Sequence, residues 1–236
     1  MTNHETYTLD LNGRTAPLRV RRHARARNII LRIDAEAGGA VLTLPKRASL
    51  REGLELARKK AAWIIERLDA LPQRAPFIDG GEVPFLGERR RIVHRPGGRL
   101  VTHIDGDIFV GGALEHLARR LTDWLKAEAK RLIQLRAEAF AAKLSRRVGR
   151  IAIRDTRSRW GSCSAKGNLN FCWRLVMAPR FVLDYVVAHE VAHLAHMNHG
   201  PEFWRAVEDL AHDPKAARRW LRKNGEDLRR YGKGSQ

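Results

Sequence analysis

Residues 179–199 read PRFVLDYVVAHEVAHLAHMNH, and this stretch decides how the rest of the chain is interpreted. Apolar side chains fill most positions from Phe181 to Val187, which predicts a largely buried helix. Pro179 begins it, at a position where the missing N–H of proline costs nothing. Four of the ten histidines of the chain fall within the last eleven residues of the stretch. A buried helix with clustered imidazoles indicates a metal site.

His189 and His193 are four residues apart, so a helix places both imidazoles on one face. Two neutral imidazole nitrogens in this arrangement can hold one Zn²⁺ at about 2.0–2.1 Å each. Glu190 is next to the first ligand and therefore lies beside the metal without binding it. A general base for metal-bound water is needed at that place, which makes Glu190 the candidate catalytic residue.

A catalytic zinc needs a third protein ligand, and His196 and His199 compete for this role. His196 lies on roughly the same helix face as the first two histidines and would crowd one side of the metal. His199 follows Asn198, which tolerates a left-handed conformation, and precedes Gly200-Pro201, which ends helices. The chain can therefore turn and bring His199 back to the metal, so we favour His199 over His196.

Motifs on both sides of this cluster match one known family. They are Arg159-Trp160-Gly161-Ser162-Cys163, Asn168-Leu169-Asn170, Trp173-Arg174-Leu175, Ala178-Pro179, Asp184-Tyr185-Val186-Val187, His189-Glu190-Val191-Ala192-His193-Leu194, and Asn198-His199 through Phe203-Trp204. Over about residues 155–210 the sequence resembles the YgjP-like metallopeptidase family, which is related to the SprT-like and WLM-like zinc proteases. The resemblance implies a zincin-like fold, zinc ligands His189, His193 and His199, and catalytic Glu190.

The N-terminal half carries the patterns of a small sheet and one helix. Residues 29–33 alternate, Gly38-Gly39 follows, and residues 40–44 are apolar, which predicts a β-hairpin. Ser49 and Glu52 form a capping box, and apolar residues then step by three and four. Residues 49–70 are therefore expected to form a helix, and residues 77–112 a group of short strands.

The longest helix is expected over residues 114–144, with Leu117, Leu125 and Leu135 among its buried stripe. Residues 149–175 have the pattern of strand, turn and strand, and no internal repeat is visible. We therefore expect an α+β fold. A β-rich N-terminal region with one helix would span residues 1–112, and a zincin-like metallopeptidase domain would occupy the C-terminus, residues 113–236.

Composition limits the partners. The net charge is +19, and arginines cluster without intervening acids between Arg14 and Arg32, so DNA or another polyanion is a possible partner. No run of eighteen apolar residues exists, which predicts no membrane span. The first residues lack a signal peptide pattern, so we expect a cytoplasmic location. Cys163 and Cys172 are expected to be buried free thiols, which fits a reducing compartment.

The leading hypothesis is a zinc-dependent metallohydrolase, a metallopeptidase of the HExxH type in which Glu190 activates zinc-bound water, possibly acting on DNA-associated proteins. A peptide or protein substrate could add as a strand near Trp160–Ser164 or Asn170–Arg174. Two alternatives stay open. The resemblance also implies a nucleotide (UTP) pyrophosphatase, although no P-loop is present. The basic charge favours a nucleic-acid-binding module with a non-catalytic metal site, against which the free Glu190 argues.

Overall fold

The computed structural model describes residues 5–11, 13–34, 37–70, 73–156 and 159–232. The chain divides into two compact units, residues 1–72 and 73–236, which are described separately. This division precedes the boundary expected after residue 112, because the strands of residues 82–111 pack with the helix that follows them. Residues 1–4, on which the signal-peptide expectation depends, lie outside the described residues. Among the described helices, none is long and apolar enough to cross a membrane.

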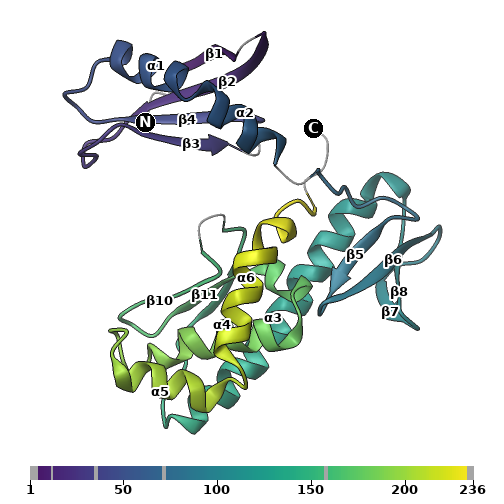
Figure 1. Ribbon diagram of the computed structural model, residues 1–236. Helices are drawn as coiled ribbons and strands as arrows, with labels where there is room; N and C mark the ends of the chain where they lie inside the picture. Colours follow the sequence, from purple (N-terminus) through teal and green to yellow (C-terminus); the bar gives the residue numbers. More distant parts are fainter. Residues whose placement is uncertain (1–4, 12, 35–36, 71–72, 157–158, 233–236) are drawn as a thin grey trace. The chain divides into compact units, whose positions relative to one another are not determined.

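The first unit is a four-stranded sheet with two helices (Figure 1). Its elements are β1 (Glu5–Leu11), β2 (Arg14–Arg22), β3 (Ile30–Asp34), β4 (Gly39–Leu44), α1 (Leu50–Lys59) and α2 (Ala61–Asp69). The strand order is β1-β2-β4-β3, with β2 and β4 parallel and the other pairs antiparallel. The expected hairpin is present as β3 and β4, where Ile33 pairs with Ala40.

The capping box is also confirmed, because the Ser49 backbone N–H donates to Glu52 Oε2 at 2.7 Å. The single helix expected over residues 49–70 is instead divided at Lys60, whose φ of −100° and ψ of 15° depart from helical values. Gly53 of α1 lies directly against the sheet. An added Cβ there would be 2.6 Å from Leu42 Cδ2, so glycine allows the helix to approach β4 closely.

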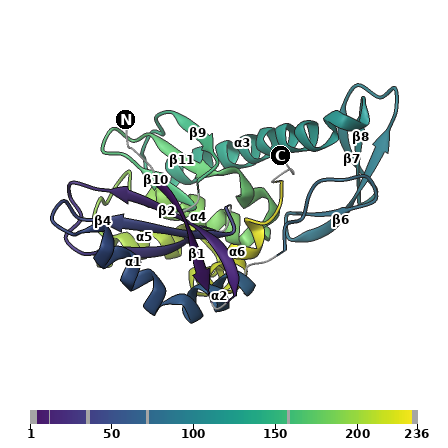
Figure 2. The ribbon, with the colours of Figure 1, turned by 90° about the horizontal axis from the view of Figure 1, so that it is seen from above.

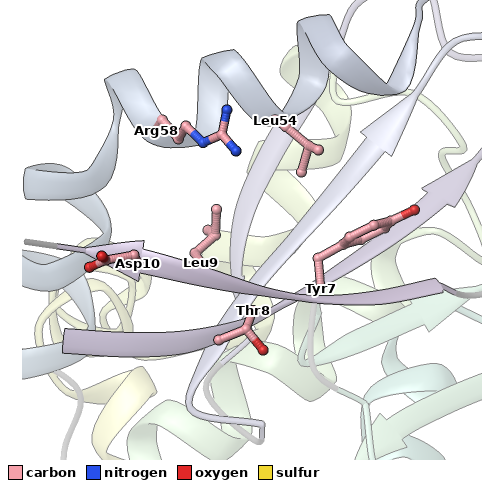
Figure 3. Close-up of a pocket in the computed structure, with 6 residues that line it drawn as sticks. All are labelled: Tyr7, Thr8, Leu9, Asp10, Leu54 and Arg58. Atoms are coloured by element: carbon pink, nitrogen blue, oxygen red, sulfur yellow. The ribbon is translucent and has the colours of Figure 1, made fainter. Parts of the chain in front are cut away.

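Figure 3 shows the edge of this helix-covered face, where an open pocket of about 440 Å³ lies between β1 and α1. Leu9 from β1 and Leu54 from α1 point toward one another across it, and Thr8 points to the opposite side of the strand. Since side chains alternate along a strand, the core of the unit lies on the helix side. The side chains that alternate with these buried residues lie on the opposite face of the sheet.

The second unit contains two sheets and four α-helices among its described residues (Figure 1). Its elements are β5 (Glu82–Phe85), β6 (Glu88–Arg95), β7 (Val101–Ile104), β8 (Asp107–Gly111), the 3-10 helix η1 (Leu114–His116), α3 (Leu117–Lys143), β9 (Ile151–Arg154), β10 (Gly161–Cys163), β11 (Leu169–Cys172), the 3-10 helix η2 (Trp173–Met177), α4 (Arg180–Ala192), α5 (Pro201–Leu210) and α6 (Pro214–Leu228). The α+β class is therefore confirmed.

The first sheet of this unit repeats the topology of the N-terminal sheet, although no repeat is visible in the sequence. Its order is β5-β6-β8-β7, with β6 and β8 parallel and the outer pairs antiparallel. The turn between β3 and β4 and the turn between β7 and β8 each contain a glycine with positive φ, Gly38 and Gly106. The buried helix positions recur with one spacing, at Gly53, Ala57, Ala61 and Ile64 and at Leu121, Leu125, Ala129 and Leu132. The two units thus share a four-strand and helix plan.

Helix α3 links the two sheets of the second unit. Figure 1 and Figure 2 both show the β5–β8 sheet at one end of α3 and the β9–β11 sheet toward the other. Leu117 and Leu125 are buried as expected, but Leu135 is 60% exposed. The buried stripe passes instead through Ile133 and Ala137, because the neighbouring Arg136 is directed to α4.

Candidate metal centre

Helix α4 is buried on nearly all sides, so it holds its polar residues in fixed places. It begins directly after Pro179. Phe181, expected to be buried, is 40% exposed at this first turn. Further along, Asp184 accepts two hydrogen bonds from the Arg136 guanidinium, at 2.8 and 2.9 Å. This paired contact ties α4 to α3 and fixes the rotation of the helix that carries His189 and Glu190.

The histidines meet because α4 stops where the second one begins the turn. His193 is the C-cap residue and keeps near-helical angles, φ −64° and ψ −18°, so its spacing from His189 remains that of a helix. The chain then turns, and α5 starts at Pro201. The expected turn is present, although Asn198 does not take the left-handed conformation considered from the sequence. The turn brings His199 back until its Nε2 lies 3.3 Å from Nε2 of His189.

The donor set fits one small, tetrahedral cation. One ligand atom from each of His189, His193 and His199 lies within 4.8 Å of the others. Tetrahedral bonds of about 2.0–2.1 Å require ligand atoms about 3.3–3.4 Å apart, which matches the His189–His199 separation. His193 shares a hydrogen bond between Nδ1 and the His196 carbonyl oxygen at 3.1 Å. That contact leaves Nε2 of His193 free to bind a metal.

His196 therefore takes part through its backbone and not through its ring. Its imidazole is not in the group that could hold a metal, as far as the described residues go. The carbonyl of His196 is placed by the tight turn, in which the His196 N–H donates to Ala192 O at 2.9 Å. Of the two histidines considered as third ligand, His199 is the one with a ring nitrogen near those of His189 and His193.

The imidazoles of α4 are held in the neutral form that a metal requires. Burial, together with the nearby His193, His199 and Arg218, lowers the pKa of His189 to about 4. Burial also lowers the pKa of His193. The hydrogen bond to the His196 carbonyl raises this pKa, but burial has the larger effect. Near neutral pH no proton has to be displaced from these two nitrogens when a metal binds.

Glu190 is a buried carboxyl group, with only 6% of its surface exposed. Burial raises its pKa to about 7, and the positive charge of Arg159 opposes that rise. Gly161 of β10 lies against it, so closely that an added Cβ would be 2.6 Å from both Glu190 Cγ and Oε1. Sequence reasoning missed this contact, although a glycine inside a strand is a signal of close approach.

Aromatic rings surround the three imidazoles. The Phe203 ring centroid lies 5.0, 4.6 and 4.7 Å from those of His189, His193 and His199. Trp204 lies 5.9 Å from His189 and from His199, and the Arg218 guanidinium stacks on it at 5.1 Å. Phe203 and Trp204 therefore pack directly against the imidazoles.

Trp173 belongs to the hydrophobic core of this unit, and Trp160 packs against that core. Trp160 is covered by Gly225 of α6, where an added Cβ would be 3.1 Å from the ring, and by the Arg229 guanidinium at 4.7 Å. This packing anchors the chain immediately before Gly161.

Strand β10 is an edge strand beside the histidine cluster. The sheet order is β10-β11-β9, so β10 pairs with β11 on one side only within the described part of the chain. Of the two edges considered from the sequence, the one near Trp160–Ser164 is free. The prediction of a free edge near Asn170–Arg174 is wrong, because β11 is the central strand and η2 follows it.

Both cysteines are free thiols, as expected, but the expected burial holds for Cys172 alone and is wrong for Cys163. Cys172 is buried, and Cys163 is partly exposed at the end of β10. Burial and the nearby Glu190 raise the pKa of the Cys163 thiol, so it is not activated as a nucleophile. Neither cysteine joins the group of described residues that could hold a metal.

The family comparison agrees with the motifs. The model of the YgjP-like metallopeptidase domain matches residues 27–224. The metallopeptidase zymogen jannalysin of Methanocaldococcus jannaschii is 19% identical, with a TM-score of 0.34, over 40% of this chain and 94% of that one. The zymogen abylysin of Pyrococcus abyssi is 21% identical, with a TM-score of 0.32, over 47% and 97%. No curated protein matches the sequence. Since this family model matches most of the chain, the chain belongs to the YgjP-like metallopeptidase family.

Proposed function

We propose that the protein is a zinc metallopeptidase in which His189, His193 and His199 hold the metal and Glu190 is the catalytic residue. The observation that carries this proposal is the gathering of three imidazoles around one point, with a buried carboxyl group on the same helix. Membership of a metallopeptidase family supports a catalytic metal. Three protein ligands leave one position open, which is typical of catalytic zinc.

Zinc bound there would supply a Lewis acid that lowers the pKa of water and polarises the substrate carbonyl. Glu190 takes a proton from the attacking water, because it follows His189 directly and is shielded from solvent. The same carboxyl group then donates that proton to the nitrogen of the leaving amine. A pKa near 7 suits a group that must accept and release a proton in one cycle. Arg159 keeps part of the Glu190 population ionised.

The substrate is proposed to bind along β10. Its free edge presents backbone N–H and C=O groups, and a peptide can pair with such an edge as an additional strand. Gly161, the first residue of β10, lies against Glu190, so a peptide on this strand passes the catalytic carboxyl group. This arrangement favours an extended, unfolded segment as substrate.

The test uses protein purified without a histidine tag. Zinc content is measured first, and the wild type and Glu190→Gln are then compared on an unstructured protein and on UTP. We expect about one zinc per chain and proteolysis that is lost in the variant, since the base contributes about 10²–10⁴-fold. Hydrolysis of UTP without any peptide cleavage would reject the peptidase and favour the nucleotide pyrophosphatase.

A second proposal concerns DNA, because the outer face of the first sheet is basic. Arg19 and Arg21 of β2 alternate with buried Leu18 and Val20, so they project from the face opposite α1. Arg32 of β3 lies opposite Val41, which also pairs with Arg19. Within the first unit no described helix covers this face.

This basic face favours duplex over single-stranded nucleic acid. Tyr7, the aromatic residue of β1, lies on the helix side, and the described strand residues of the outer face include no aromatic ring on which bases could stack. Binding should therefore depend on phosphate contacts and weaken steeply with salt.

The test replaces Arg19, Arg21 and Arg32 together by serine, with Arg58 and Lys59 on α1 replaced in a matched control. Anisotropy with duplex DNA should show weaker binding and a shallower salt slope in the first variant alone. Equal losses in both variants would contradict a specific face.

A further inference from the structure

A small cavity of about 180 Å³ lies next to His193 in the second unit. Three segments enclose it: the chain after α3, the turn between β10 and β11, and the turn after α4. The residues that line it include Arg146, Arg147, Ser164, Gly167, His193 and Met197. The volume is below the roughly 300–1,000 Å³ of sites for whole small ligands, so it suits a single side chain.

The backbone of the cavity is held in place by hydrogen bonds. Ser145 has a φ of 52° and ends α3, and the Arg146 N–H donates to Ala141 O at 2.9 Å. On the facing side, the Gly167 N–H donates to Ser164 O at 2.8 Å, and Gly167 has a φ of 73°. An added Cβ at Gly167 would be 3.4 Å from Leu194, so this turn packs against the segment after α4.

The lining carries a single sign of charge. Arg146 and Arg147 are adjacent, and no aspartate or glutamate lines the cavity. Within the described part of the chain neither guanidinium forms an ion pair. Leu194 and Met197, which is 58% exposed, provide an apolar wall. A cleft lined by one sign of charge attracts the opposite sign, and two guanidinium groups beside aliphatic carbon suit a carboxylate on a short methylene stem.

One wall of the cavity directly continues strand β10. Ser164 directly follows β10, whose first residue Gly161 lies against Glu190. Three residues of extended chain span about 10 Å. A peptide paired with β10 therefore reaches the cavity within about three residues of the bond that is cleaved at Glu190.

We propose that this cavity, named here the arginine subsite, receives an aspartate or glutamate side chain of the peptide substrate. The inference rests on the proposed peptidase function. The position of the arginine subsite also predicts the chain direction of the bound peptide. Strand β10 runs from Glu190 toward the subsite, so a peptide antiparallel to β10 runs from the subsite toward Glu190. Its acidic residue then lies on the N-terminal side of the cleaved bond.

Cleavage is tested with the zinc-loaded, full-length protein and quenched fluorescent peptides that carry glutamate or glutamine at each of three positions on either side of the bond. We expect about tenfold higher kcat/KM for glutamate at one N-terminal position, as charge-assisted hydrogen bonds suggest. The preference should disappear in Arg146→Gln/Arg147→Gln. It should persist in the matched control Arg150→Gln, which changes an exposed arginine outside the cavity.

A binding measurement separates this inference from the proposed function. Fluorescence anisotropy with Glu190→Gln, which cannot turn over, should show tighter binding of the glutamate peptide and loss of that difference when both arginines are replaced. Equal binding and equal cleavage of the two peptides would overturn the subsite and leave the peptidase intact. Preferential binding without any cleavage by the wild type would reject the peptidase and retain the subsite. Competition by UTP that depends on both arginines, with no peptide preference, would assign them to phosphate and overturn the proposal.

Discussion

Gly161→Ala tests the position of the catalytic carboxyl group. The added methyl would lie 2.6 Å from Glu190 Cγ and Oε1. Carbon atoms in contact are about 3.5–4.0 Å apart, so either β10 or the carboxyl group must move by about 1 Å. The φ of Gly161 is not positive, so the substitution introduces this overlap without backbone strain. A displacement of about 1 Å can reduce the rate about 100-fold, and overpacking costs about 1–3 kcal/mol of stability.

The assay measures kcat/KM on a cleaved peptide together with zinc content and urea unfolding. We expect kcat/KM to fall about 100-fold while zinc content remains near one per chain, since the added methyl contacts Glu190 and not a ligand. Gly200→Ala is the matched control, because its nearest neighbour, Asn198 Oδ1, would be 3.5 Å from the new Cβ. Wild-type kcat/KM in Gly161→Ala, or a loss that parallels loss of zinc, would refute this reasoning.

Three further predictions concern the ligands, pH and the support of α4. His199→Ala should lose zinc by elemental analysis while His196→Ala retains it, and the reverse would reject the ligand set. Arg159 lowers the pKa of Glu190, and Glu190 is active when ionised. Arg159→Ala should therefore move the acidic limb of the kcat/KM profile to higher pH. An unmoved limb would contradict this. Arg136→Ala leaves Asp184 without its paired hydrogen bonds and should cost about 1–3 kcal/mol in urea unfolding; an unchanged midpoint would show that the pair adds nothing.

The parts of the site that could be predicted are those determined by neighbours in sequence. The spacing of His189 and His193 fixes a common helix face. Pro201 begins α5, so the chain turns before it, and this turn returns His199 to His189. The left-handed conformation considered for Asn198 is not used, because its φ is not positive. The β3–β4 hairpin and the capping box of α1 likewise depend on short spacings. Each of these is a local rule that tertiary packing had no reason to override.

The parts that were missed depend on contacts between distant segments. Gly161 meets Glu190 only after β10 has packed on α4, so neither residue alone indicates the contact. Leu135 has the spacing of a buried residue, but α3 must also direct Arg136 toward α4, which leaves Leu135 exposed. Arg146 and Arg147 line the cavity only because three separate turns converge.

The repeated sheet plan was missed for a related reason. The two units share a strand order and a spacing of buried helix positions. The side chains at those positions differ, as Gly53 and Leu121 do. Self-similarity of sequence requires matching residues, whereas the fold requires only that the same positions be buried. The division of the chain after residue 72 follows from this plan, because the strands of residues 82–111 belong with α3.

X-ray absorption at the zinc edge of the untagged protein identifies the metal ligands. We expect zinc with nitrogen and oxygen neighbours only, at about 2.0–2.1 Å, and the scattering pattern of three imidazoles. The Glu190→Gln variant should give the same spectrum, because that residue is not a ligand. A sulfur neighbour at about 2.3 Å, four protein ligands, or no bound zinc would contradict a catalytic site built from His189, His193 and His199.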